Sequence, residues 1–371
     1  MTQEPLSPLQ FRIDRVRQSR ATRVDFASIP FSSVFSDHML VAEYADSIWK
    51  NPAIQPYGAL PLPPNISALQ YGISIFEGLK AHRATDDRIL LFRPEENARR
   101  LNRSAARLAM PAVPETMFID GLCELLRLDK AWIPPAGAGA LYIRPCLFSV
   151  DGSVRVKPPD RVLFVIFTFP FANYYAAPVD VFVTEQYVRA FPGGTGDVKP
   201  GGNYAPCLVA DQQAQELGYG TVMWLDGLER KYVEECGVMN VFFVVQRDAA
   251  KQVVTPELSG TILPGVTRDT TIQLLRDMGI EIEERRIAID EVFAWHRDGK
   301  LLECFGTGTA ATVSHITRIR YRGDDIALPP IEQRNVGPAV RERLIATATG
   351  EAADTHRWVY EVKHNVNEPS S

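Results

Sequence analysis

The sequence lacks the residue patterns that mark metal centres, disulfide frameworks and membrane spans. Its five cysteines are scattered, odd in number and form no Cys-x-x-Cys pair, which argues against a disulfide framework or a structural zinc site and suggests a reducing compartment. The six histidines are equally dispersed, so no metal site is expected. The longest apolar runs, such as residues 162–167, are far shorter than the roughly 20 residues needed to cross a bilayer.

An excess of positive charge is also lacking. The formal net charge is −5, so no basic field favours nucleic acid or an anionic membrane. The arginine-rich stretch at residues 12–23 could indicate a mitochondrial presequence, but Glu4, Asp14 and Asp25 interrupt it, and transit peptides are poor in acids. We therefore expect a cytoplasmic protein that binds neither nucleic acid nor membrane.

The composition indicates a globular α/β or α+β protein with two domains. The 371 residues, 46% of them hydrophobic, exceed what one ordinary core accommodates. We expect a small N-terminal α/β domain (residues 1–174), a linker (175–182) and a large C-terminal domain (183–371).

Local patterns predict where the main elements lie. Residues rich in β-branched and aromatic side chains predict strands at 38–44, 141–150, 161–169, 221–226, 239–245 and 301–305. Helices are predicted from Pro94 to about Leu108, near 115–130, after Pro206 and from about 268 to 278. A hairpin-like turn is expected at Gly227.

One lysine stands in an unusual setting. Only nine of the 40 basic residues are lysines, and Lys199 lies among five glycines in PGGTGDVKPGG. Glycines permit close backbone approach, and Pro200 fixes the path of the chain. A P-loop is excluded because Lys199 lies between Val198 and Pro200 instead of in Gly-Lys-Ser/Thr. Taken alone, the motif also fits a loop with one solvated lysine.

Three further motifs follow this lysine. Glu234 and Glu235 precede an apolar strand, where a carboxylate suits a protonated pyridine nitrogen, although two exposed glutamates would give the same pattern. The Pro-Gly turn before Val266 and Thr267 predicts a helix start that suits a phosphate, or simple helix capping. GTGTAAT at 306–312 matches a dinucleotide fingerprint, but the residues after it are strand-like, so a backbone turn offering N–H groups is favoured.

The order of these motifs resembles that of the branched-chain aminotransferases of pyridoxal phosphate fold type IV. The resemblance extends from about Phe35 to Trp358 and includes SDHM at 36–39, YGISIFEGLKA at 71–81, FRPEENARRL at 92–101 and LYIRP at 141–145. It implies a two-domain enzyme with the cofactor, pyridoxal 5′-phosphate, at the domain interface.

The resemblance also assigns roles to single residues. Lys199 would carry the cofactor as a Schiff base and move the proton between the substrate and the cofactor. Tyr204 matches the tyrosine that bonds the ring hydroxyl, Glu235 the acid at the ring nitrogen, and Arg100 the phosphate-binding arginine. The remaining phosphate contacts fall on Val266, Thr267 and Thr309. The substrate pocket would consist of Phe35, Tyr71, Phe76, Tyr142, Arg144, Tyr174 and Ala310.

Three positions depart from the family pattern. Val238 stands where Thr or Gly is usual, and Thr221 where Gln is usual. The inter-subunit loop reads Val154-Arg155-Val156 where the family has Leu-Gly-Val. Ala311 and Ser314 replace the paired cysteines of animal forms, so no redox switch of that type is expected.

The resemblance predicts a homodimeric transaminase. Leucine, isoleucine or valine and 2-oxoglutarate would give branched 2-oxo acids and glutamate. The departures leave open the same chemistry on an aromatic, D- or specialised amino acid. A non-catalytic binding protein on the same fold is disfavoured, because every cofactor position carries a suitable residue.

Overall fold

The computed structural model describes residues 10–50, 52–172 and 178–363, and they form two compact units. The first unit comprises Met1–Tyr174 together with Thr347–Ser371, and the second comprises Tyr175–Ala346. The first unit is therefore built from two separate stretches of chain. Residues 347–371, expected in the C-terminal domain, group with the N-terminal half instead.

The first unit is organised around a ten-stranded sheet in its described residues. Its strand order is β1-β4-β2-β9-β8-β6-β7-β19, with β3 on β2 and β5 on β8. The long pair β8 and β9 forms the centre, in antiparallel register from Gly139↔Ala172 to Ser149↔Val162. The strands are β1 (Arg12–Ile13), β2 (His38–Ala45), β3 (Ile48–Trp49), β4 (Ala53–Pro56), β5 (Ser74–Phe76), β6 (Leu79–Arg83), β7 (Ile89–Phe92), β8 (Gly139–Ser149), β9 (Val162–Ala172) and β19 (Val359–Glu361).

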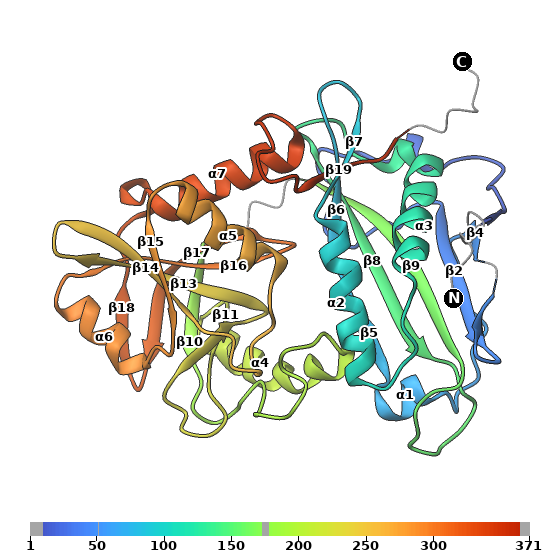
Figure 1. The fold of residues 1–371 in the computed structure, drawn as a ribbon. Helices are drawn as coiled ribbons and strands as arrows, with labels where there is room; N and C mark the ends of the chain where they lie inside the picture. The colour runs from blue at the N-terminus through green and yellow to red at the C-terminus, as the bar shows by residue number, and fades with distance from the viewer. Residues whose placement is uncertain (1–9, 51, 173–177, 364–371) are drawn as a thin grey trace, which may run out of the picture. The chain divides into compact units, whose positions relative to one another are not determined.

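Two helices pack together against this sheet (Figure 1). They are α2 (Pro94–Arg107) and α3 (Glu115–Leu128), and the shorter α1 (Ser67–Tyr71) precedes β5. Leu101 of α2 and Leu122 of α3 are completely buried, and Phe118 stacks on Phe164 of β9 at 5.8 Å between ring centroids. Each such side chain stabilises the fold by about 1.5–3 kcal/mol.

The second unit is built on a nine-stranded sheet in its described residues. The order is β12-β11-β10-β17-β16-β13-β14-β15, and β12 also pairs with β13, so six of these strands form a closed ring. The strands are β10 (Val179–Val183), β11 (Thr221–Leu225), β12 (Val233–Cys236), β13 (Met239–Arg247), β14 (Ala250–Pro256), β15 (Glu281–Arg285), β16 (Leu301–Gly308), β17 (Thr312–Tyr321) and β18 (Asp324–Ala327). The helices are α4 (Leu208–Glu216), α5 (Val266–Asp277), α6 (Ile289–Arg297) and α7 (Val336–Thr349), of which the last three residues belong to the first unit.

A buried carboxylate anchors the start of α7. Glu303 is 1% exposed and accepts hydrogen bonds from the backbone N–H groups of Asn335, Val336 and Gly337 at 2.8–2.9 Å. These N–H groups have no carbonyl partner within the helix, and the helix dipole favours a negative charge beside them. Glu303 therefore acts as the N-cap of α7 from the neighbouring strand β16.

The predicted elements are confirmed, with differences at their ends. The expected strand 301–305 continues through Gly308, so only residues 309–311 form the predicted turn. Part of the expected linker belongs to β10, and its residues 175–177 lie outside the described residues. The arginines of α2 differ in exposure: Arg100 is buried, whereas Arg103 and Arg107 are exposed.

Candidate functional site

The loop that carries Lys199 is held in shape by one asparagine. The Asn203 side chain donates to the carbonyls of Thr195 at 2.7 Å and Val198 at 3.2 Å, and it accepts from Thr195 Oγ1 at 2.6 Å. Gly196 passes so close to residue 261 that a Cβ there would lie 2.3 Å from the Thr261 carbonyl oxygen. Lys199 Nζ donates to the Tyr204 hydroxyl at 2.8 Å. The glycine-rich sequence thus forms a fixed loop that places the Lys199 amine next to the Tyr204 hydroxyl.

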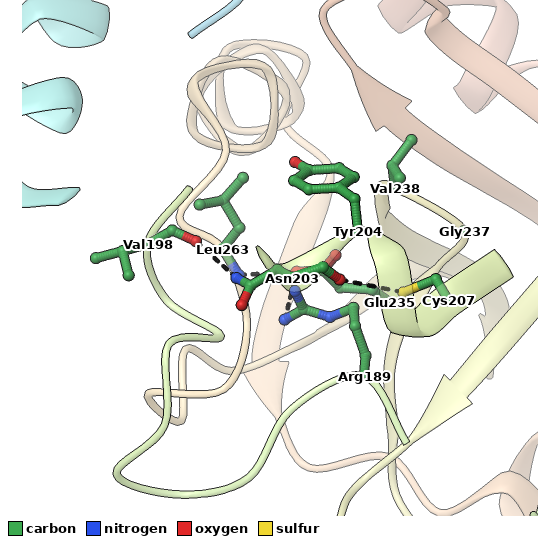
Figure 2. A pocket seen from close by; sticks show the side chains of 9 residues that line it. All are labelled: Arg189, Val198, Asn203, Tyr204, Cys207, Glu235, Gly237, Val238 and Leu263. Carbon is green, nitrogen blue, oxygen red and sulfur yellow. Dashed lines mark hydrogen bonds and ion pairs between the residues drawn. The ribbon is translucent and has the colours of Figure 1, made fainter. Parts of the chain in front are cut away.

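Glu235 faces a small cavity that Tyr204 also lines (Figure 2). Its carboxylate is 4% exposed, accepts a hydrogen bond from the Leu263 backbone N–H at 2.8 Å and pairs with Arg189 at 3.1 Å. These two partners stabilise the ionised form in a buried setting. The cavity therefore offers a fixed carboxylate next to the Lys199–Tyr204 pair.

Glu234 is equally buried, which shows that the exposed-glutamate interpretation is wrong for both residues. Successive side chains of a strand point to opposite faces, and Glu234 lines a second cavity with Thr261 and Tyr232. Its Oε1 accepts a hydrogen bond from Thr261 Oγ1. Burial raises the pKa of Glu234, an effect that this hydrogen bond and the charge of Arg189 partly offset.

The start of α5 is shaped for close approach to β13. The Asn240 side chain donates to the Leu263 carbonyl at 2.9 Å, and a Cβ at Gly265 would lie 2.2 Å from Asn240 Oδ1. Val266 and Thr267 lie in the first turn of the helix, and its N-cap residue, Gly265, has no side chain that could bond the free N–H groups. Backbone N–H groups at such a start suit an anion.

Thr309 and Ala310 lie half-buried in the turn between β16 and β17. The last pairs before this turn are Thr307↔Val313 and Gly308↔Thr312. On the other side, Thr307 pairs with Asn240 of β13, the residue that contacts the loop before α5. The β-ladder therefore places this turn on the same side of the second unit as the start of α5.

The remaining predicted cofactor residue, Arg100, belongs to the first unit. Its guanidinium makes a two-point contact with Glu77: Nε to Oε1 and Nη2 to Oε2 are both 2.8 Å. Asn97 donates to the same carboxylate at 2.8 Å. The side chains of Arg100 and Glu77 are 5% and 0% exposed, and a two-point contact fixes the plane of the guanidinium. Arg100 is therefore rigidly oriented on α2.

Four of the predicted substrate-pocket residues gather in the first unit. Tyr142 stacks on Phe169 at 5.0 Å, and Phe35 meets the same ring edge-on at 5.6 Å. The guanidinium of Arg144 lies 4.6 Å from the ring centre of Phe76 and 5.4 Å from that of Tyr142. A ring face stabilises a cation at such distances.

Tyr71 and Tyr174 are the two other pocket residues predicted in the first unit. Tyr71 is 43% exposed, and its hydroxyl donates to the carbonyl of Val154 in the loop that contains Arg155. Tyr174 lies outside the described residues.

The three departures from the family pattern have distinct surroundings. Val238 is 67% exposed and lines the Glu235 cavity from the turn that Gly237 begins at φ 57°. The Thr221 hydroxyl donates a hydrogen bond to the Asp211 carboxylate at 3.1 Å. Arg155 is exposed.

Metal-ligating clusters and membrane spans are both missing from the described part of the chain. No group of three or more His, Cys, Asp or Glu side chains there could hold a metal ion. No helix in the same residues is long and apolar enough to cross a membrane.

The family model for amino-transferase class IV matches residues 74–319, two thirds of the chain. The chain belongs to this family. Several similar proteins match it along nearly their whole length. Branched-chain-amino-acid transaminase 1 of Bacillus subtilis (strain 168) is 42% identical over 343 residues, which cover 91% of this chain and 95% of that protein. A branched-chain-amino-acid aminotransferase of Mycolicibacterium smegmatis is 40% identical over 368 residues, covering 95% and 98%.

Solved structures of branched-chain amino acid aminotransferases have the same fold. The branched-chain amino acid aminotransferase of Escherichia coli covers 88% of this chain and 99% of its own, at a TM-score of 0.70 and 24% identity. The T.th. branched-chain amino acid aminotransferase complexed with N-(5′-phosphopyridoxyl)-L-glutamate covers 87% and 98%, at a TM-score of 0.68 and 25% identity.

Sequence reasoning missed the residues that orient the side chains of the candidate site in the second unit. These are Asn203, Asn240, Thr261 and above all Arg189, the partner of Glu235. Asn203 lies in the segment GGNYAP (residues 201–206) directly after Lys199 and Pro200, and could have been singled out there. Arg189 lies 46 positions before its partner, and no local pattern connects the two.

Proposed function

We propose that this aminotransferase transfers the amino group of leucine, isoleucine or valine to 2-oxoglutarate, with pyridoxal 5′-phosphate as cofactor. The observation that carries the proposal is the Lys199 amine bonded to Tyr204 beside the cavity of the buried Glu235. The identity of 42% to a branched-chain transaminase over 91% of the chain supports the substrate class.

The groups present in the second unit fit this cofactor. Lys199 would hold it covalently, Tyr204 would bond its ring hydroxyl, and Glu235 would pair with its ring nitrogen. Thr267 and Val266 at the start of α5, with Thr309, would bind its phosphate. Pyridoxal phosphate supplies an electron sink for the charge that forms when the substrate Cα loses a proton.

The chain's own residues then have simple tasks. Lys199 Nζ would take the proton from the substrate Cα and would then deliver it to the cofactor. Tyr204, 2.8 Å from Nζ, orients that amine. Arg189 and the Leu263 N–H hold the Glu235 carboxylate in place, so no reorganisation is needed during the reaction.

For the first unit we propose that Arg100 binds the phosphate. Phe35, Tyr71, Phe76, Tyr142, Arg144 and Tyr174, with Ala310, would form the pocket for the substrate. Aromatic walls suit a branched aliphatic side chain. Arg144 would accept the second carboxylate of glutamate in the other half-reaction.

We also propose a cytoplasmic homodimer. Apolar side chains are strongly exposed around one loop of the first unit: Val154 at 66%, Val156 at 79% and Leu69 at 68%. Exposed apolar side chains grouped in this way are typical of protein–protein contacts. Val156→Glu should dissociate the dimer in light scattering, whereas Glu342→Lys, at an exposed position, should leave it intact.

The function is tested with a donor panel and one variant. The purified protein should be yellow and should use leucine, isoleucine and valine in preference to aromatic or D-amino acids. Lys199→Ala should lose transamination and no longer show a cofactor-sized mass increase after borohydride treatment, whereas Lys251→Ala should retain both. Slow rates with all three branched donors beside a fast aromatic or D-donor would refute the substrate. Normal turnover by Lys199→Ala would refute the chemistry.

A further inference from the structure

We propose that Glu234 is a positioning residue for the cofactor: its charge balances Arg189, so that Glu235 remains available to the protonated ring nitrogen. This inference rests on the proposed function. It starts from two adjacent glutamates of β12, both 4% exposed, that face two different cavities.

Arg189 is connected to both carboxylates. Its Nη2 contacts Glu235 Oε1 directly at 3.1 Å and donates to the carbonyl of Thr261. The hydroxyl of the same Thr261 donates to Glu234 Oε1. One threonine therefore links the cation to the second carboxylate through its carbonyl and its hydroxyl.

The hydrogen bonds leave room for both protonation states of Glu234. Thr261 has only one hydroxyl proton, which it donates to Glu234, so the contact of 2.8 Å between Ser259 Oγ and Thr261 Oγ1 must have Ser259 as the donor. Glu234 Oε2 is buried and has no hydrogen-bond partner among the described residues. A proton on Glu234 would therefore reside on Oε2, without disturbing the bond to Thr261.

Counting charges gives the direction of the effect. With both glutamates ionised, the cluster of Arg189, Glu234 and Glu235 carries one net negative charge, which a protonated ring nitrogen neutralises. With Glu234 neutral, the same ring would leave one unbalanced positive charge in a buried site. Ring binding therefore favours loss of the proton from Glu234, and the Glu234 carboxylate favours ring binding.

The test compares apoprotein binding of pyridoxal phosphate in three forms of the chain. Glu234→Gln removes the charge but keeps the shape, and Glu257→Gln removes an exposed carboxylate from the rim of the same cavity. We expect Glu234→Gln to bind the cofactor about tenfold more weakly at neutral pH, which corresponds to about 1.4 kcal/mol. Glu257→Gln should bind like the unaltered chain.

Proton release provides a readout that a purely structural role would not change. Calorimetry in two buffers of different ionisation enthalpy, from about pH 5 to about pH 8, should detect proton release on cofactor binding where Glu234 is protonated in the apoprotein. A proton that the Lys199 ammonium loses when it bonds the cofactor is common to both chains, so Glu234→Gln should release fewer protons than the unaltered chain in this pH range. In turnover it should lower kcat more than it changes KM for the amino donor, because the ring charge matters most in the transition state.

The outcomes separate this inference from the proposed function. If Glu234→Gln matches Glu257→Gln in both affinity and proton release, the inference is refuted while the proposed function stands. If the unaltered chain binds no cofactor and Lys199 gains no mass after borohydride, the proposed function fails and the inference fails with it. Circular dichroism of Glu234→Gln distinguishes misfolding from a charge effect, and Glu234→Asp, which keeps the charge, should restore part of the affinity and proton release.

Discussion

Gly196 offers a sharp test of how the Lys199 loop is held. A methyl group at this position would lie 2.3 Å from the Thr261 carbonyl oxygen and 2.5 Å from Ala190 Cβ. The obstacle is backbone, so the loop must move by about 1 Å to reach ordinary van der Waals contact. That movement would weaken the hydrogen bonds from Arg189 Nη2 to the carbonyls of Gly196 and Thr261.

The expected cost follows from these contacts. Overpacking of this kind costs about 1–3 kcal/mol, and each of the two hydrogen bonds, weakened but not broken, costs about 0.5 kcal/mol, so Gly196→Ala should lose roughly 2–4 kcal/mol. For a unit of the size of Tyr175–Ala346, this corresponds to a fall in melting temperature of roughly 4–16 °C. The assay is differential scanning fluorimetry of the apoprotein.

Gly202→Ala is the matched control in the same loop. Nothing lies within 4 Å of a Cβ built at Gly202, and its φ is not positive. Its melting temperature should stay close to that of the unaltered chain. If Gly196→Ala melts within about 1 °C of Gly202→Ala, the close approach to Thr261 does not hold the loop, and the reasoning is refuted.

Three further predictions concern buried charges. Glu303→Ala leaves three N–H groups of α7 without their acceptor and should lower the free energy of unfolding in urea by about 3 kcal/mol, unlike Glu342→Ala on the exposed face. Arg189→Met leaves the Glu235 carboxylate without its cation and should lower apoprotein stability by about 3–5 kcal/mol. The cofactor should then raise the melting temperature of Arg189→Met more than that of the unaltered chain; an equally stable Arg189→Met apoprotein would contradict this. Burial raises the pKa of Glu234 in the folded protein above its ordinary value of 4.5, which applies to the unfolded chain. Between the ordinary pKa and the raised pKa, the folded apoprotein therefore binds more protons than the unfolded chain. Stability should fall as pH rises through that window, and Glu234→Gln should remove that part of the slope in urea unfolding measured across it.

The sequence predicted the elements well because their signals are local. The strands β2, β8 and β9 are rich in β-branched and aromatic residues, and α2 begins at Pro94 with the apolar stripe expected of a surface helix. These patterns depend only on neighbours along the chain, so the elements can be predicted from the sequence without knowing the fold.

The interactions that orient the site could not be predicted in this way. Arg189 meets Glu235, and Thr261 meets Glu234, across long stretches of chain. Whether a glutamate at a strand entrance is exposed or buried depends on which loop covers it, and that follows from tertiary packing alone. The same reason explains Arg100, which has the local setting of a surface arginine but is paired with Glu77 in the core.

The division of the first unit into two stretches affects the order in which this protein can be made. Strand β19 pairs with β7, with Val359 opposite Phe92 and Glu361 opposite Leu90. A ribosome therefore synthesises the whole of Tyr175–Ala346 before it reaches β19. Until then the sheet of the first unit lacks this edge strand. The second unit has its own closed ring of strands and can fold during that interval, whereas β7 waits with an unpaired edge.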